Sequence, residues 1–229
     1  MESEINLKAK PLKAAFLFLL TGLYLSEALG ILIFLIASGF SIAKISKVLS
    51  SATIYGVALI TICFFRTTSV AYYWNWLKKK NLLKLKFRFS WKLLPVLIVT
   101  LIFILLWKPD ILAGKPQSLT EFTFFKNKYG IYSGSLLFLL QYIYYFLEAL
   151  VIVLILEGFQ TAGEAKFSRS LPWGGIALII FWSGIHFFSK GISTGIYAVC
   201  QGIIFSAAFL WDKRNGLIVM LIWFLSLLL

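Results

Sequence analysis

The chain has 229 residues, of which 60% are hydrophobic and only 14% are charged, and its formal net charge is +13. A single soluble core cannot bury that share of apolar side chains, so the composition excludes an ordinary soluble domain and indicates that lipid is the solvent. The basic residues lie between apolar runs and form no single basic face, which argues against nucleic acid and for membrane lipid as a partner.

Runs of apolar residues predict transmembrane helices, because a helix needs about 20 such residues to cross a bilayer. We expect an all-α polytopic transmembrane helix bundle of about seven spans, with six or eight as the alternatives. Residues 1–229 then form a single integral membrane domain of a multi-pass protein in the cell membrane. The predicted spans are Ala14–Phe40, Val48–Trp76, Trp91–Trp107, Ile131–Phe159, Trp173–Phe188, Thr194–Trp211 and Leu217–Leu229.

The distribution of Lys and Arg predicts a cytoplasmic N-terminus, because cytoplasmic segments of membrane proteins are enriched in these residues. With the N-terminus inside, 15 of the 22 basic residues lie in inner segments, and the others, among them Lys44 and Lys47, lie in outer ones. Most of this bias comes from the basic cytoplasmic loop 77–92. Apolar residues stand between its charges, which favours a segment on the inner leaflet as much as a solvated loop. The longest outer loop, Lys108–Gly130, contains two Pro and two Gly, and turns are expected there.

The two cysteines, Cys63 and Cys200, lie inside apolar runs and are expected to be small buried side chains. They provide no disulfide framework, and the chain shows no metal-ligand spacing. One histidine with scattered glutamates is a poor zinc site, so we expect no metal and no other cofactor.

Ionisable residues inside the spans are the candidate functional residues, because a charge in lipid is costly. Glu157, Gln160, Thr161 and Glu164 follow the spacing of one helical face. This polar stripe predicts the wall of a water-filled cavity, the alternative being that the helix simply leaves the membrane there. Other polar residues within the spans are Glu27, Glu148 and Gln201, of which the last two are also cavity-lining candidates.

His186 is the only histidine and lies deep in the fifth predicted span. Glu157 and His186 are about equally far from the turn that ends at Pro172, so an antiparallel hairpin predicts that they face each other. Glu148 lies nine residues before Glu157, close to the opposite side of the helix, which makes Glu157 the better partner. Such a pair suits water activation or a proton relay, and the alternative is a buried histidine satisfied by one carboxylate without chemistry.

Three segments of the chain carry a resemblance to a known family. The first reads ILEGFQTAGE (155–164), the second PWGGIALIIFWSGIH (172–186), and the third is the glycine-punctuated GISTGIYAVCQGIIF (191–205). Through them residues 148–229, within a family-like core 131–229, resemble the CAAX-protease and bacteriocin-processing family of intramembrane glutamate proteases. That family carries a Glu-Glu-x-x-x-Arg motif, then Phe-x-x-x-His, then His-x-x-x-Asn on a late span.

The chain departs from these motifs at several positions. Gly158 and Ala162 stand at the second Glu and the Arg of the first motif, and Trp182 replaces the Phe of the second. In the last span Trp223 and Leu227 occupy the His and Asn positions. The resemblance implies that Glu157 and His186 activate water, while the family's oxyanion-holding pair is missing.

The resemblance implies a divergent intramembrane CAAX-type endopeptidase that uses Glu157 as the base and His186 to position water, or a degenerate relative of such an enzyme. A prenylated or hydrophobic peptide would be its substrate. The alternative is a non-catalytic membrane protein that acts in binding or immunity, or a small transporter. A transporter is less favoured because the sequence shows no internal repeat.

Overall fold

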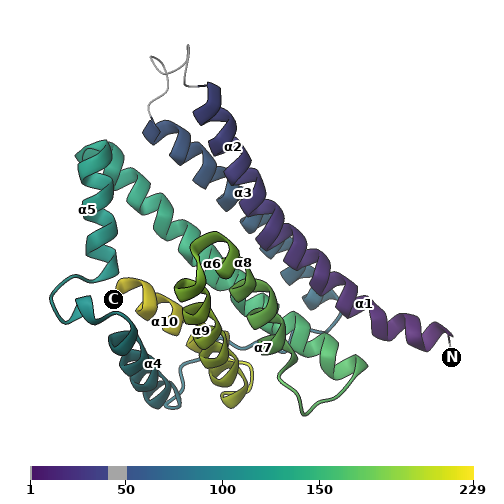
Figure 1. Ribbon diagram of the computed structural model, residues 1–229. Coiled ribbons are helices and arrows are strands. Elements are labelled where there is room, and N and C mark those ends of the chain that lie inside the picture. The colour runs from purple at the N-terminus through teal and green to yellow at the C-terminus, as the bar shows by residue number, and fades with distance from the viewer. Residues whose placement is uncertain (1, 41–50) are drawn as a thin grey trace.

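The computed structural model describes residues 2–40 and 51–229 of the chain (Figure 1). The fold is 84% helix, and the described residues form no strand, so the predicted all-α class is confirmed. Lys44, Lys47 and the start of the second predicted span lie outside the described residues.

Four helical stretches are long and apolar enough to cross a membrane, as expected of a membrane protein. Two further helices, α4 (Leu93–Trp107) and α10 (Gly216–Leu228), are apolar but shorter. At 1.5 Å per residue α4 and α10 are about 22 and 20 Å long, so each of them would cross a bilayer only where it is locally thinned. The four long stretches are Pro11–Ile33, Ala52–Lys79, Ile131–Lys166 and Ile192–Trp211.

The N-terminal third is a long helical hairpin. Helix α1 (Glu2–Leu19) continues through a π-helical turn (Leu20–Leu25) into α2 (Ser26–Phe40), and α3 (Ser51–Lys79) runs back beside them (Figure 1). The two arms approach closely where a glycine of one arm faces the other, as Gly30 does against Ile62.

Residues 80–92, which we call the strap, are mostly extended and connect α3 to α4. After α4 a 3₁₀ turn (Pro109–Ile111) leads to α5 (Gln117–Tyr129). The predicted outer loop Lys108–Gly130 therefore contains a helix as well as turns. Helix α5 packs along α6 and buries Phe125 there. This packing stabilises a helix that the Pro and Gly residues of the loop did not predict.

The long helix α6 (Ile131–Lys166) is the axis of the bundle (Figure 1). Its 36 residues span about 54 Å, which exceeds the roughly 30 Å hydrocarbon core of a bilayer. Residues 151–163 are buried without interruption, because α1, α3, α7 and α10 pack around them. The polar side chains of this stretch consequently need partners within the protein.

The chain returns after α6 as α7 (Trp173–Ala177), a π-helical turn (Leu178–Ser183) and α8 (Gly184–Lys190). These three segments follow one another without a break and cover the predicted span Trp173–Phe188 as a helix with one π-helical turn. Helix α9 (Ile192–Trp211) then runs back, and a tight turn leads into α10. Lys213 and Arg214 in that turn have φ of 53° and 65°, the left-handed region that is costly for residues with a Cβ.

The strap gathers the bundle at one end, which we call the strap end. The strap leaves α3 there, its Lys86 pairs with Asn215 in the turn before α10, and Trp173 at the start of α7 packs on Gly163 of α6. At the opposite end the Nζ of Lys108 donates to the carbonyl of Ser226 over 2.8 Å, which joins the end of α4 to the end of α10.

Candidate functional site

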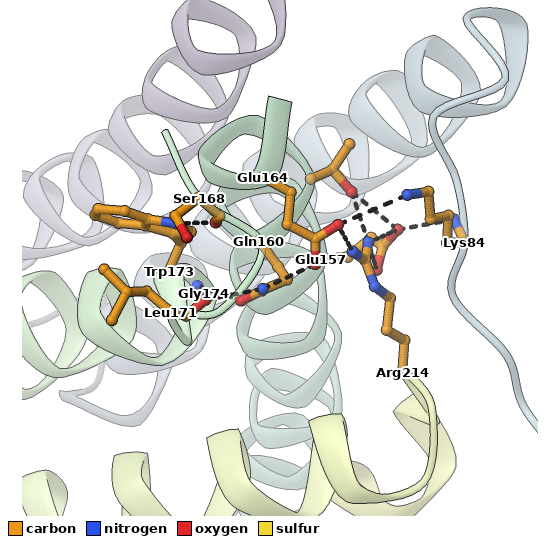
Figure 2. Close-up of polar contacts among 10 residues, drawn as sticks. Lys84, Glu157, Gln160, Glu164, Ser168, Leu171, Trp173, Gly174 and Arg214 are labelled. Carbon is orange, nitrogen blue, oxygen red and sulfur yellow. Dashed lines mark hydrogen bonds and ion pairs between the residues drawn. The ribbon is translucent and has the colours of Figure 1, made fainter. Parts of the chain in front are cut away.

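Glu157 lies in a cluster of charges at the strap end (Figure 2). Its side chain is fully buried, and its Oε1 accepts the backbone N–H of Lys84 over 2.7 Å. Nη1 of Arg214 lies 3.2 and 3.3 Å from the two carboxylate oxygens, and the hydroxyl of Thr161 donates to Oε1. The carboxylate is thus occupied by partners on three sides.

Arg214 reaches this cluster from the turn before α10, whose left-handed backbone aims its side chain at α6 (Figure 2). Its Nη1 also donates to Thr161 over 2.8 Å, and its Nη2 lies 2.6 Å from Oε2 of Glu164. The Nζ of Lys84 is 3.7 Å from the same Glu164 oxygen. Two carboxylates and two cations therefore neutralise one another where α6, the strap and the α9–α10 turn meet.

Gln160 holds the chain's return after α6. Its Nε2 donates to Glu164 and to the carbonyl of Leu171, and its Oε1 accepts the N–H of Gly174 over 3.1 Å (Figure 2). The polar stripe predicted from the sequence is therefore one face of α6, but its members serve to join α6 to the strap, the return segment and Arg214.

A cavity of about 290 Å³ lies toward the opposite end of the bundle, and His186 lines it. Glu148 lines the same cavity, whereas Glu157, Gln160 and Glu164 do not. Its walls are largely aromatic, formed by Trp107, Tyr145, Trp182, Tyr197 and Trp223. A polar site with aromatic walls is the usual composition of a small-molecule or peptide pocket.

The contacts of His186 define its tautomer. Its Nδ1 lies 2.9 Å from the carbonyl oxygen of Trp182, and a carbonyl only accepts, so Nδ1 carries the proton in the neutral ring. Nε2 then has a lone pair, and among residues 2–40 and 51–229 no side chain or backbone group hydrogen-bonds to it. The Trp182 and His186 rings also contact each other, with centroids 4.6 Å apart. His186 is thus held in place with one nitrogen free to accept a proton.

Glu148 lies behind Trp182 and joins a second buried charge network. Its Oε1 accepts the indole N–H of Trp182 over 3.0 Å, and its Oε2 is 3.9 Å from Nη1 of Arg66. Arg66 is fully buried, forms a short ion pair with Glu27, and stacks over the Tyr144 ring at 4.3 Å. One guanidinium thereby compensates two carboxylates within the bundle.

Lys108 and Gln117 close the cavity at the opposite end. The Lys108 ammonium donates to Oε1 of Gln117 over 2.6 Å and to the carbonyl of Ser226, which leaves the third of its three protons without a recorded acceptor. Burial lowers the pKa of Lys108, and the nearby negative charge of Glu121 only partly offsets this effect. The lowered pKa makes the ammonium a readier proton donor.

Gln201 lies just behind the cavity wall. It donates to the hydroxyls of Tyr197 and Ser226 over 3.0 and 3.1 Å, and both of these residues line the cavity. Its Oε1 is buried and has no partner within the described part of the chain. Trp223 and Leu227, at the positions of the family's last motif, are part of the same wall.

The structure places Glu157 and His186 in separate clusters, which corrects the expectation that they face each other. The connection after α6 folds back along the helix, so α7 starts level with a point about three turns before the end of α6: Gly174 lies against the carbonyl of Leu156. From that level Trp182 is eight residues further along and Glu148 is eight residues back, which brings these two together. His186, one helical turn beyond Trp182, lines the same cavity as Glu148, which lies about 12 Å along α6 from Leu156.

Sequence reasoning missed Arg66, Arg214 and Lys108 as members of these clusters. Arg66 stands alone among apolar residues in the second span, so its need for a buried acidic partner was a usable signal. Arg214 and Lys108 lie at helix ends and read as ordinary loop charges.

Comparison with known proteins adds no assignment. No protein-family model, no curated protein and no solved structure matches the chain. Within residues 2–40 and 51–229, no group of three or more His, Cys, Asp or Glu side chains is arranged to hold a metal ion.

Proposed function

We propose that the chain is an intramembrane peptidase of the CAAX-protease type, or a close derivative of one, whose reaction centre is the His186 cavity. The observation that supports this most directly is that His186, whose Nε2 has no hydrogen-bond partner within the described residues, lines a cavity with several aromatic side chains inside a helical bundle. Such a nitrogen is the group that a general base requires, and a half-enclosed cavity limits the water that competes with a substrate.

The proposed reaction is hydrolysis of a peptide bond in a hydrophobic or prenylated peptide. His186 Nε2 takes a proton from water, the resulting hydroxide attacks the peptide carbonyl, and the proton passes to the leaving amine. Lys108 is the candidate donor to the carbonyl oxygen, because its ammonium has a proton to spare in the same cavity. It would take the part that the family gives to the His and Asn of the last motif, where this chain has Trp223 and Leu227.

Glu148 is proposed as a positioning residue. It accepts from the indole of Trp182, whose carbonyl in turn accepts from Nδ1 of His186, so the three residues form one chain of contacts. The carbonyl of Trp182 keeps the proton on Nδ1 and the lone pair on Nε2, and Glu148 acts by holding Trp182 in place. The catalytic role that the sequence suggests for Glu157 is less well supported, since Arg214, Lys84 and Thr161 already occupy its oxygens.

Cleavage of a prenylated peptide and of a signal-like peptide in detergent tests this proposal. His186→Ala should lower turnover by about 10²–10⁴, and Lys108→Met by about 10²–10³. Glu157→Gln serves as the comparison, because its turnover per folded molecule should stay near that of the native chain. The proposal fails if the native chain cleaves neither peptide, or if His186→Ala cleaves as fast as the native chain.

A non-catalytic binding protein is the second candidate. The observation that favours it is the pairing of Glu148 with both Trp182 and Arg66, which occupies its oxygens and holds the cavity wall in one arrangement. This candidate replaces the enzyme if two results are found together. The native chain cleaves neither peptide, and a hydrophobic peptide still changes its tryptophan fluorescence saturably.

The arrangement of the helices supports seven crossings with a cytoplasmic N-terminus. From α1–α2 through α3, α4, α6, α7–α8 and α9 to α10, successive apolar segments run in alternating directions between the strap end and the opposite end. The basic strap end is then cytoplasmic. Reporter fusions to the two termini test this, since seven crossings put the N-terminus and the C-terminus on different sides.

A further inference from the structure

The strap, residues 80–92, is held to the bundle through its backbone. The N–H of Lys84 donates to Glu157, and the N–H of Lys86 donates to the carbonyl of Arg214 over 2.9 Å. The carbonyl of Lys86 accepts from Gly216, and the carbonyl of Arg88 accepts from the Asn215 amide, each over 2.8 Å. An extended segment fixed at these points presents its side chains in constant directions.

Its side chains alternate between apolar and basic. In extended backbone successive residues point to opposite sides, so such alternation gives one apolar row and one basic row. No Asp or Glu occurs between residues 78 and 92. The apolar row consists of Leu83, Leu85, Phe87, Phe89 and Trp91, and the basic row includes Lys84, Lys86, Arg88 and Lys92.

The apolar row starts in the protein core and ends outside it. Leu83 and Leu85 pack against buried core residues, and Phe87 lies beside Trp74 and Gly216. Phe89 and Trp91, in contrast, are 69% and 81% exposed. Large aromatic side chains that protrude from the end of a membrane bundle are suited to the boundary between lipid headgroups and acyl chains.

The cations of the strap and of the last turn of α3 divide into two sets. Lys84 and Arg88 are engaged by Glu164 and Asp212, and Lys92 donates to a backbone carbonyl. Four others form no ion pair with any described residue and are exposed, namely Lys78, Lys79, Lys80 and Lys86. Lys86 stands three residues before Phe89 on the strap, and Lys78, Lys79 and Lys80 stand where the strap leaves α3.

We propose that the strap is a docking surface for anionic phospholipid headgroups of the bilayer. The free lysines contact the phosphates, while Phe89 and Trp91 insert at the headgroup boundary. The fixed backbone means that the surface exists before lipid arrives, so no ordering cost is added on binding. This inference does not rest on the proposed hydrolase, because it uses only the strap and its neighbours.

Quenching of tryptophan by brominated lipid tests the proposal. The full chain is reconstituted into phosphatidylcholine bilayers that contain a minor fraction of brominated phosphatidylglycerol or, in parallel, brominated phosphatidylcholine. The signal of Trp91 is the difference between the native chain and Trp91→Phe. It should be quenched more strongly by the anionic lipid at low salt, and this preference should fall in high salt, which screens exposed charges.

A charge-matched pair of variants identifies the surface. Lys79→Gln, Lys80→Gln and Lys86→Gln together should lower the preference for anionic lipid by about five-fold or more, since each lysine near an anionic surface contributes about that factor. Lys115→Gln, Lys126→Gln and Lys128→Gln remove the same charge at the opposite end and should leave it unchanged. Equal quenching of Trp91 by the two lipids overturns the proposal, as does an equal loss in both triple variants.

Discussion

The indole Nε1 of Trp182 donates to Oε1 of Glu148 over 3.0 Å, and the carbonyl of the same Trp182 accepts from His186 Nδ1 over 2.9 Å. One tryptophan thereby links the histidine of the cavity to the buried Arg66 network behind it. The contact also fixes how α6 and the segment after α7 are aligned, because both partners lie inside the bundle.

Replacing Trp182 by Phe should destabilise the protein by about 1–3 kcal/mol, because the indole donor is lost and a buried acceptor on Glu148 is left unsatisfied. Thermal unfolding in detergent measures this. Trp91→Phe is the matched control: Trp91 is exposed and donates no recorded hydrogen bond, so its unfolding temperature should stay close to that of the native chain. Equal melting temperatures for native and Trp182→Phe would show that the indole bond contributes nothing.

Removing one partner of the Glu157–Arg214 pair should be far more damaging than removing both. Glu157→Gln leaves the Arg214 guanidinium with a weaker partner in a buried site, and breaking such a pair typically costs about 3–5 kcal/mol. In the double variant Glu157→Gln/Arg214→Met both charges of the pair are gone, and Glu164 keeps Lys84 as its cation, so part of the loss should be recovered. The unfolding free energies of the two single variants and the double variant give the coupling directly. If the two losses in unfolding free energy simply add in the double variant, the two side chains do not stabilise each other.

The sequence predicts the helical class and the positions of most apolar helices, because hydropathy and helix length are local properties. It also groups Glu148, Gln201 and His186 with Glu157, Gln160 and Glu164 around one cavity, whereas the last three do not line the His186 cavity. It misassigns the partner of His186, since that depends on where the chain turns back after α6. Gly163 and Gly174 allow Trp173 and α7 to lie flat against α6, and this close approach moves the alignment by several residues. The spacing of the polar residues in the sequence does not predict this change in the alignment of α7 with α6.

Acid should loosen the strap through Asp212. Burial alone would raise the pKa of Asp212, but hydrogen bonds from Asn215 and Ser90 and the guanidinium of Arg88 lower it below the ordinary value of 3.8. A carboxylate with a lowered pKa in the folded state stabilises the fold above its unfolded pKa, and this contribution is lost as the pH falls through the lower folded value.

Hydrogen exchange of the strap amides measures this loss. At neutral pH Asp212→Asn should speed exchange at Lys86 and Gly216, whose amides close the strap's backbone pairing, relative to the native chain. Below pH 3.8 the difference between the two proteins should shrink, because native Asp212 then becomes protonated as well. Asp110→Asn, on an exposed turn, is the control and should exchange like the native chain. A difference that stays constant across the acid range would exclude Asp212 as the titrating group.

The close approach of α7 to α6 predicts the effect of two alanine substitutions. A Cβ at Gly174 would collide with the backbone carbonyl of Leu156, and backbone cannot move aside as a flexible side chain does. Gly174→Ala should therefore destabilise the protein by about 1–3 kcal/mol and displace Trp182 from Glu148. Gly184→Ala, on the same return segment, meets nothing within 4 Å and should be neutral or slightly stabilising, because alanine favours helix. Unfolding in detergent together with tryptophan fluorescence compares the two, and equal stability of both variants would mean that α7 does not lie against α6 at this level.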